Sequence, residues 1–144
     1  MPTRPVGARQ RLQLQGHARS LALEIAAEAR AEWGFASEII ARSFRAHREL
    51  ASGDRRGISE TVYGLIRMDR RLDAILEELV GRDAARGLPP VTRDALKLLI
   101  HEVREGLPVE AARAEAARLA APGAAPIDLE RAAAEDAGLG RREG

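Results

Sequence analysis

The chain has 144 residues, a formal net charge of +1 and no cysteine. This length suits one domain with a substantial core, and the lack of cysteine excludes thiol catalysis, disulfides and cysteine-ligated zinc. The commonest residues are alanine, leucine, arginine and glutamate, which favour helices, and no run of 18 apolar residues could span a membrane. We therefore expect an all-α protein of the cytoplasm.

Charge is distributed unevenly along the chain. Residues 1–71 contain 13 basic and 8 acidic side chains, whereas residues 72–144 contain 10 basic and 14 acidic ones, so the two parts carry +5 and −4. This asymmetry indicates a basic face near the N-terminus. Arginine outnumbers lysine 22 to 1, and arginine suits phosphate binding and base stacking better than lysine does. A GC-rich genome would produce the same bias.

The first part of the chain predicts an arm and two helices. Residues 1–11 combine prolines, a glycine and arginines without apolar periodicity, which predicts a flexible basic arm. From about residue 12 to residue 33, apolar residues recur at steps of three and four, which predicts an amphipathic helix closed by Gly34. A second helix is predicted from Phe35 to about Leu50.

Two further helices are predicted after the break at residues 52–53. Asp54 is a suitable N-cap for the third helix, which carries apolar residues on one face and arginines along its length. The fourth helix has an apolar face that ends at Gly81. Residues 82–90 are predicted to form a loop that ends at a pair of prolines.

The remainder of the chain predicts three more helices. The fifth covers residues 91–105, with Gly106 as a left-handed C-cap, and Pro108 is expected as the first residue of the next helix. A short helix is expected over about residues 127–137. Residues 12–137 would then form one all-α domain of six or seven helices, and residues 138–144 a disordered tail or the start of a linker.

The sequence offers little that suggests catalysis. The three histidines, His17, His47 and His101, lie far apart in the sequence and lack the spacing of a zinc-binding motif. None of the serines lies in a Gly-x-Ser-x-Gly turn. We therefore expect no catalytic residue, no metal site and no cofactor, and no enzymatic activity from this chain by itself.

Arginines are the candidate binding residues. They lie in the arm and first helix, at the start of the third helix, where free backbone N–H groups favour an anion, and around the end of that helix. If they converge, they would bind phosphate with salt-sensitive affinity. The alternative is that each arginine pairs with a carboxylate or only solvates the surface. The candidates are Arg9, Arg11, Arg19, Arg55, Arg56, Arg67, Arg70 and Arg71.

One block of the sequence resembles a known family. Residues 54–56 are Asp-Arg-Arg, and residues 60–67 are Glu-Thr-Val-Tyr-Gly-Leu-Ile-Arg. This block resembles the most distinctive part of the NusB-like N-terminal RNA-binding domain of bacterial rRNA cytosine-C5 methyltransferases, the RsmB/Sun group. Weaker similarity extends the resemblance over roughly residues 17–121, and it implies a NusB-like helical bundle. The chain departs from the family at His101-Glu102, where an aromatic-Gln pair is usual, and across residues 112–117.

The resemblance implies a non-catalytic module that binds RNA, expected to be rRNA, for a cytosine methyltransferase domain in the same chain or in trans. The family's S-adenosylmethionine loop and its two cysteines are absent here, so the chain is expected to be a fragment of a larger enzyme or a free-standing relative. A second possibility is a NusB-type transcription antitermination factor that binds RNA and a ribosomal protein. A third is a protein-docking module without an RNA role that uses the small-residue face of Ala112–Ala120.

Overall fold

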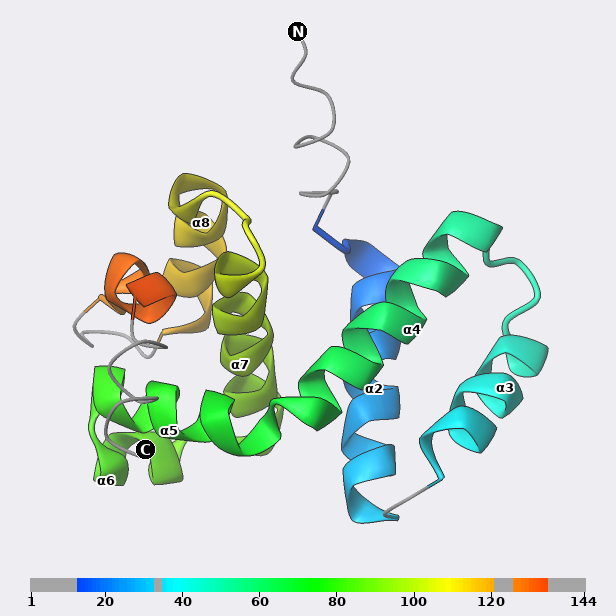
Figure 1. The fold of residues 1–144 in the computed structure, drawn as a ribbon, viewed down its shortest axis with the longest axis horizontal. Coiled ribbons are helices and arrows are strands. Elements are labelled where there is room, and N and C mark those ends of the chain that lie inside the picture. The colour runs from blue at the N-terminus through cyan, green and yellow to red at the C-terminus, as the bar shows by residue number, and fades with distance from the viewer. Residues whose placement is uncertain (1–12, 33–34, 121–125, 135–144) are drawn as a thin grey trace, which may run out of the picture. The chain divides into compact units, whose positions relative to one another are not determined.

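The computed structural model describes residues 13–32, 35–120 and 126–134, and within these ranges the protein is all-α, with no strand (Figure 1). The helices are α2 (Gly16–Ala31), α3 (Ala36–Ala46), α4 (Ser52–Arg67), α5 (Asp69–Val80), α6 (Arg82–Gly87), α7 (Pro90–Arg104) and α8 (Val109–Leu119). Residues 129–134 are helical as well. The all-α prediction is therefore confirmed, while the predicted arm and tail lie outside the described residues.

The described helices outnumber the six or seven predicted, because the expected loop over residues 82–90 contains the short helix α6. Gly81 ends α5 with a φ of +95° and serves as the N-cap of α6. Residues 82–86 contain no glycine or proline, so nothing in them opposes a turn of helix. Ala85 is fully buried, and its carbonyl accepts a hydrogen bond of 2.8 Å from Arg93. The loop prediction was wrong because this tertiary contact stabilises a segment that is short and lacks apolar periodicity.

Three helix starts also differ from the prediction, that of α4 by three residues and those of α7 and α8 by one residue each. The helix α4 begins at Ser52 with Ala51 as its N-cap, so Asp54 lies in the first turn and is not the cap. A carboxylate there still interacts favourably with the helix dipole. The helix α7 begins at Pro90, and Pro108 is the N-cap of α8, one position before its first residue. Gly106 has the expected positive φ, +115°, after the end of α7.

The chain divides into two compact units. The first unit is Leu14–Asp69, and the second consists of Arg70–Gly144 together with Met1–Gln13. The predicted single domain over residues 12–137 stays a prediction. No helix within the described ranges is long and apolar enough to cross a membrane.

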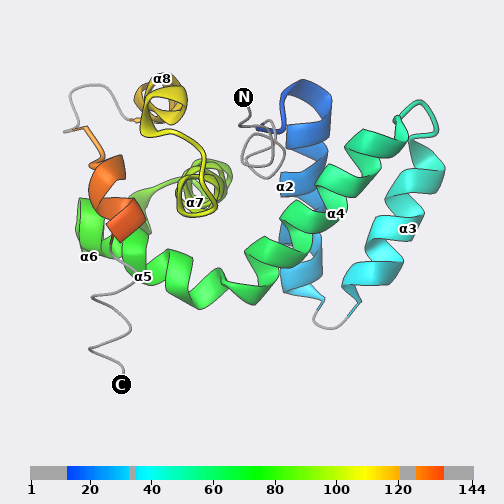
Figure 2. The same cartoon turned by 45° about the horizontal axis from the view of Figure 1, so that its top comes forward.

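The core of the first unit lies where α2 packs against α3 and α4 (Figure 2). Each helix contributes the face that its apolar spacing predicts, as Ile25, Ile39 and Val62 show, all at most 1% exposed. Leu50, in the connection between α3 and α4, is buried against the same cluster. This buried leucine fixes the connection to the unit, which matters for the site described below.

The helix α7 is the most buried helix of the second unit. Residues 95–100 are all buried, which is the pattern of a helix covered on every side. Leu99 and Val103 of α7 pack against Ala112 and Ala116 of α8 and against Leu129. The small-residue face of α8 is therefore occupied within its own unit, so the surface proposed for protein docking is not exposed at these two alanines.

Candidate nucleic-acid interface

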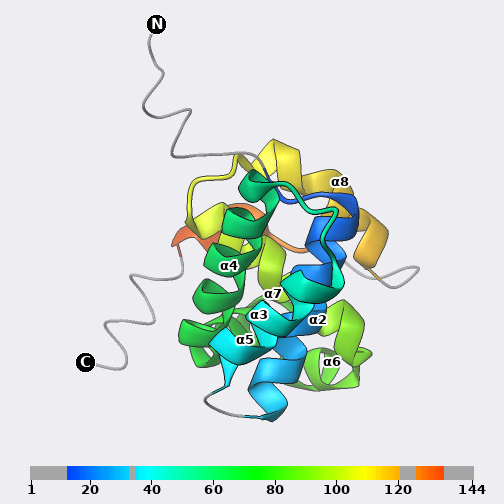
Figure 3. The ribbon, with the colours of Figure 1, turned by 90° about the vertical axis from the view of Figure 1, so that its right-hand side faces the viewer.

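The end of α3 and the start of α4 lie together at one end of the first unit, and four arginines fall in this stretch of the chain (Figure 3). Arg45 lies in the last turn of α3, Arg48 in the connection, and Arg55 and Arg56 in the second turn of α4. We call these four residues the basic end. The connection between the helices is short, and because Leu50 is buried it cannot swing away from the unit. The local fold therefore fixes the path of a short stretch that carries all four arginines, and the hydrogen bond from Arg55 to the Arg48 carbonyl joins the connection to α4.

Arg55 is the most constrained residue of the basic end. Its Cζ lies 5.8 Å from the centroid of the Phe44 ring, within the range of a cation–π contact. Its Nη2 donates a long hydrogen bond, 3.5 Å, to the carbonyl of Arg48. Its Nε is buried and has no hydrogen-bond partner among the residues that the structure describes. Arg55 is thus positioned by its neighbours, and no carboxylate of the described residues forms an ion pair with it.

The other three arginines of the basic end are exposed. None of the guanidinium groups of Arg45, Arg48 and Arg56 forms a hydrogen bond or ion pair with another described residue. The carboxylates in the same stretch are Glu49 and Asp54, so four guanidinium groups face two carboxylates. The first turn of α4 adds backbone N–H groups without intrahelical partners and the positive end of a helix dipole. This end of the unit is suited to an anion.

The other predicted arginines do not all join this group. Arg19 lies near the start of α2, where its Nη1 donates a hydrogen bond of 2.9 Å to the Leu14 carbonyl. Arg67 is the last residue of α4, about 16 Å along the helix axis from Arg56 at 1.5 Å per residue. Arg70 and Arg71 belong to α5 and to the second unit. Arg9 and Arg11 lie outside the described residues. Of the predicted arginines, only Arg55 and Arg56, which are neighbours in the sequence, belong to the basic end, and the structure does not place Arg67 beside them.

Sequence reasoning missed Arg45 and Arg48. A signal for them was present, since arginines recur every three residues at positions 42, 45 and 48. Arg42 shows why that signal is ambiguous: its Nη2 pairs with the Glu28 carboxylate of α2. Whether an arginine forms an ion pair depends on which residues of another helix lie opposite it. The spacing of arginines along the sequence does not contain that information.

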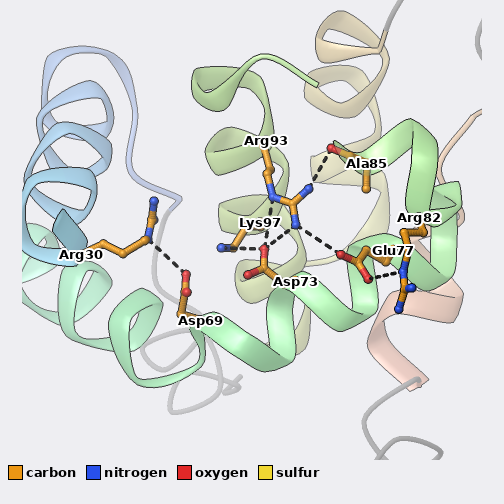
Figure 4. A network of polar contacts seen from close by, with 8 residues as sticks. All are labelled: Arg30, Asp69, Asp73, Glu77, Arg82, Ala85, Arg93 and Lys97. Atoms are coloured by element: carbon orange, nitrogen blue, oxygen red, sulfur yellow. Dashed lines mark hydrogen bonds and ion pairs between the residues drawn. The ribbon is translucent and has the colours of Figure 1, made fainter. Parts of the chain in front are cut away.

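In the second unit, several cations have a structural role instead (Figure 4). The Asp73 carboxylate accepts hydrogen bonds from Arg93 through Nε at 3.2 Å and through Nη2 at 2.8 Å, and Lys97 Nζ lies 3.0 Å away. Lys97 is only 4% exposed. Glu77 lies between Arg93 and Arg82, at 3.7 and 3.8 Å. These charges are paired within the unit, in agreement with the alternative that arginines pair with carboxylates of the same fold.

The first unit also contains a cavity of about 300 Å³. Its wall includes an ion pair, since Arg30 Nε lies 3.3 Å from an Asp69 carboxylate oxygen (Figure 4). The two charges offset each other, so the cavity presents no net charge to a ligand. Its lining residues are Ala29, Arg30, Ala36, Ser37, Tyr63, Ile66 and Asp69. We assign no chemistry to this cavity.

Two of the three histidines meet beside the basic end. The ring centroids of His17 and His47 are 5.1 Å apart in an edge-to-face arrangement, and Glu49 Oε2 lies 3.4 Å from both His17 Nε2 and His47 Nδ1. The pKa of Glu49 lies below its ordinary value, chiefly because the carboxylate accepts a backbone hydrogen bond from its own residue, with smaller contributions from His47 and His17. The sequence did not reveal this cluster because 30 positions separate the two histidines.

Comparison of the chain with profiles of known protein families finds no match. Comparisons with curated proteins and with solved structures also find no match. The NusB-like resemblance and the RNA-binding residues it implies therefore stay predictions from the sequence.

Proposed function

We propose that this chain is a non-catalytic module that binds RNA and presents rRNA to a cytosine-C5 methyltransferase domain, in the same chain or in trans. The observation that carries the proposal is the basic end, a short stretch with four arginines, three of which are exposed and have no partner among the described side chains. The resemblance of residues 54–67 to the NusB-like domain supplies the identity of the polyanion. Those same residues form most of α4 and contribute Arg55 and Arg56 to the basic end.

The chemistry of the basic end fits RNA. Arginine binds phosphate through a planar fork of donors and also stacks on bases, and RNA-binding proteins commonly stack unpaired bases on guanidinium planes. Arg55 is held over the Phe44 ring, which positions its guanidinium before any ligand arrives. Exposed Arg48 and Arg56 flank it along the chain and are available for phosphates. We therefore expect unpaired segments of rRNA to bind better than regular duplex.

Fluorescence anisotropy with labelled single-stranded rRNA fragments, across a series of salt concentrations, tests the proposal. Replacing Arg48 and Arg56 together by alanine should weaken binding and reduce the slope of log affinity against log salt by about 1.4, since each phosphate contact to a single strand contributes about 0.7. Arg86→Ala is the matched control, because Arg86 is an exposed arginine of α6 whose side chain has no partner among the described residues. If the double variant binds as the control does, the basic end is not the RNA site.

Two further measurements define the ligand. Arg67→Ala should leave the affinity nearly unchanged if the interface is confined to the basic end, because Arg67 lies at the opposite end of α4. Duplex DNA of the same charge should bind more weakly than single-stranded rRNA at every salt concentration. Equal affinity for the two would indicate general attraction to polyanions and would contradict the assignment to RNA.

A further inference from the structure

The histidine cluster of the first unit combines three groups that bind metals. His17 comes from the start of α2, His47 follows the last residue of α3, and Glu49 lies in the connection to α4. Their ligand atoms all lie within 4.8 Å of one another. We propose that these three residues form a binding site for a divalent transition-metal ion of the Zn²⁺ type. This inference does not depend on the proposed RNA-binding function.

The distances within the cluster match a metal site. In tetrahedral coordination, zinc lies about 2.0–2.1 Å from nitrogen and about 2.0–2.2 Å from oxygen, so two ligand atoms are about 3.4 Å apart. Glu49 Oε2 lies 3.4 Å from His17 Nε2 and 3.4 Å from His47 Nδ1. Two edges of the tetrahedron therefore exist already. The third edge, between the two imidazole nitrogens, can close by rotation of the exposed His17 side chain.

The ligand types select the class of ion. Imidazole suits zinc, copper, nickel and iron, whereas sites for calcium and magnesium are built from oxygen ligands. The three protein ligands leave at least one position of the ion for water or another ligand. The site is open, since the side chains of His17, His47 and Glu49 are 55%, 33% and 63% exposed. The positive charge of the neighbouring arginines repels a metal ion. We therefore expect this site to bind the ion more weakly than a closed site of four protein ligands does.

A bound ion would link the start of α2 to the connection between α3 and α4. These segments are 30 residues apart, and an ion that binds only the folded arrangement stabilises it in proportion to the logarithm of the ion concentration. Metal binding should therefore raise the thermal stability of the first unit. Such stabilisation, together with a need for both histidines, distinguishes a specific site from loose association of the ion with surface carboxylates.

Isothermal titration of the full chain with ZnCl₂, after removal of any polyhistidine tag and without RNA, tests the site. We expect one ion per chain, a higher thermal unfolding midpoint with Zn²⁺, and a visible absorption spectrum with Co²⁺ typical of low coordination. His17→Ala, His47→Ala and Glu49→Gln should each reduce the affinity at least about tenfold, which is the lower bound known even for residues that only support a metal ligand. His101→Ala, which removes the third histidine, in α7 of the second unit, is the control.

The outcomes separate this proposal from others. Absence of stoichiometric binding by the unaltered chain, or unchanged affinity in Glu49→Gln, would overturn the metal site. Glu49 is 63% exposed, so Glu49→Gln should fold even if a histidine variant does not. Since the titration contains no RNA, its failure would leave the RNA-binding proposal untouched, and the Arg48 and Arg56 variants should still bind Zn²⁺.

Discussion

The two units of this protein use arginine in different ways. In the second unit, guanidinium groups mainly form ion pairs within the unit: Arg93 with Asp73 at 2.8 Å, Arg113 with Glu130 at 3.0 Å and Arg131 with Glu78 at 3.1 Å. In the first unit, the basic end leaves three exposed guanidinium groups without a partner among the described residues. The same residue type thus forms ion pairs within the fold in one unit and stays exposed, without a partner among the described residues, in the other.

The difference follows from what lies opposite each arginine. Asp73 and Glu77 are one turn apart on α5, and they meet Arg93 and Lys97, one turn apart on α7. In the connection between α3 and α4, the carboxylate of Glu49 is engaged with two histidines. Whether an arginine forms an ion pair within the fold is therefore decided by the neighbouring elements more than by the arginine itself.

The largest expected effect tests whether the units are distinct in stability. Leu99 is fully buried in α7, and Leu99→Ala should reduce the free energy of unfolding of the second unit by about 3 kcal/mol through the cavity it leaves. Amide hydrogen exchange should show the loss of protection mainly in α7 and α8. Ile25→Ala in α2 is the mirror variant for the first unit. An equal loss in both units would show one cooperative structure and weaken the comparison.

The next effect concerns the paired charges. Asp73→Asn removes the negative charge that Lys97 and Arg93 share, and we expect a loss of about 2–3 kcal/mol in the free energy of unfolding, less than for a fully buried pair because Asp73 is partly exposed. Urea unfolding measures the loss. Asp83→Asn on α6 is the control, since Asp83 is exposed and has no partner among the described side chains. A loss as small as that of the control would mean that the network does not stabilise the fold.

Variants of the basic end should lose RNA affinity but keep their stability, unlike the variant of the paired charges. Replacing Arg48 and Arg56 by alanine removes exposed charges that contact no carboxylate, so the free energy of unfolding should change by less than about 0.5 kcal/mol. The same protein sample should lose RNA affinity. Thermal unfolding and anisotropy of one preparation give both quantities. Marked destabilisation would show that these arginines support the fold after all.

The smallest expected effect is the pH dependence of Glu49. Its pKa is lower in the folded protein than the ordinary value of 4.5, so the ionised carboxylate adds stability above that value, and this contribution is lost as the pH falls through the folded pKa. The unfolding midpoint of the unaltered chain should therefore exceed that of Glu49→Gln near about pH 7 and approach it near about pH 3. Glu24→Gln, an exposed change on α2, is the control. A difference that grew on acidification would contradict this assignment.

Much of the fold could be predicted because it depends on local pattern. The apolar spacing located α2, α4, α5 and α7, and Gly81 and Gly106 end their helices with the positive φ that glycine adopts most easily. The helix α6 was missed because it is stabilised by a bond from Arg93, which lies outside the segment. Sequence alone therefore failed where a contact between elements decides the local structure.

The candidate site follows the same rule. Arg55 and Arg56 could be identified because they lie in a recognisable block at the start of a helix. Arg45 and Arg48 join them only through the path of the connection between α3 and α4. The meeting of His17 with His47 depends on the packing of α2 against the other two helices of its unit, and no spacing along the chain encodes it.

Lys97 gives this protein an unusual chemical property. It is the one lysine of these 144 residues and is 4% exposed, so an amine-reactive reagent should modify this side chain very slowly while the second unit is folded. Modification at position 97 then requires that unit to open. Mass spectrometry of the peptide that contains Lys97 would measure the rate of modification, and hence how often the second unit opens, without an engineered probe.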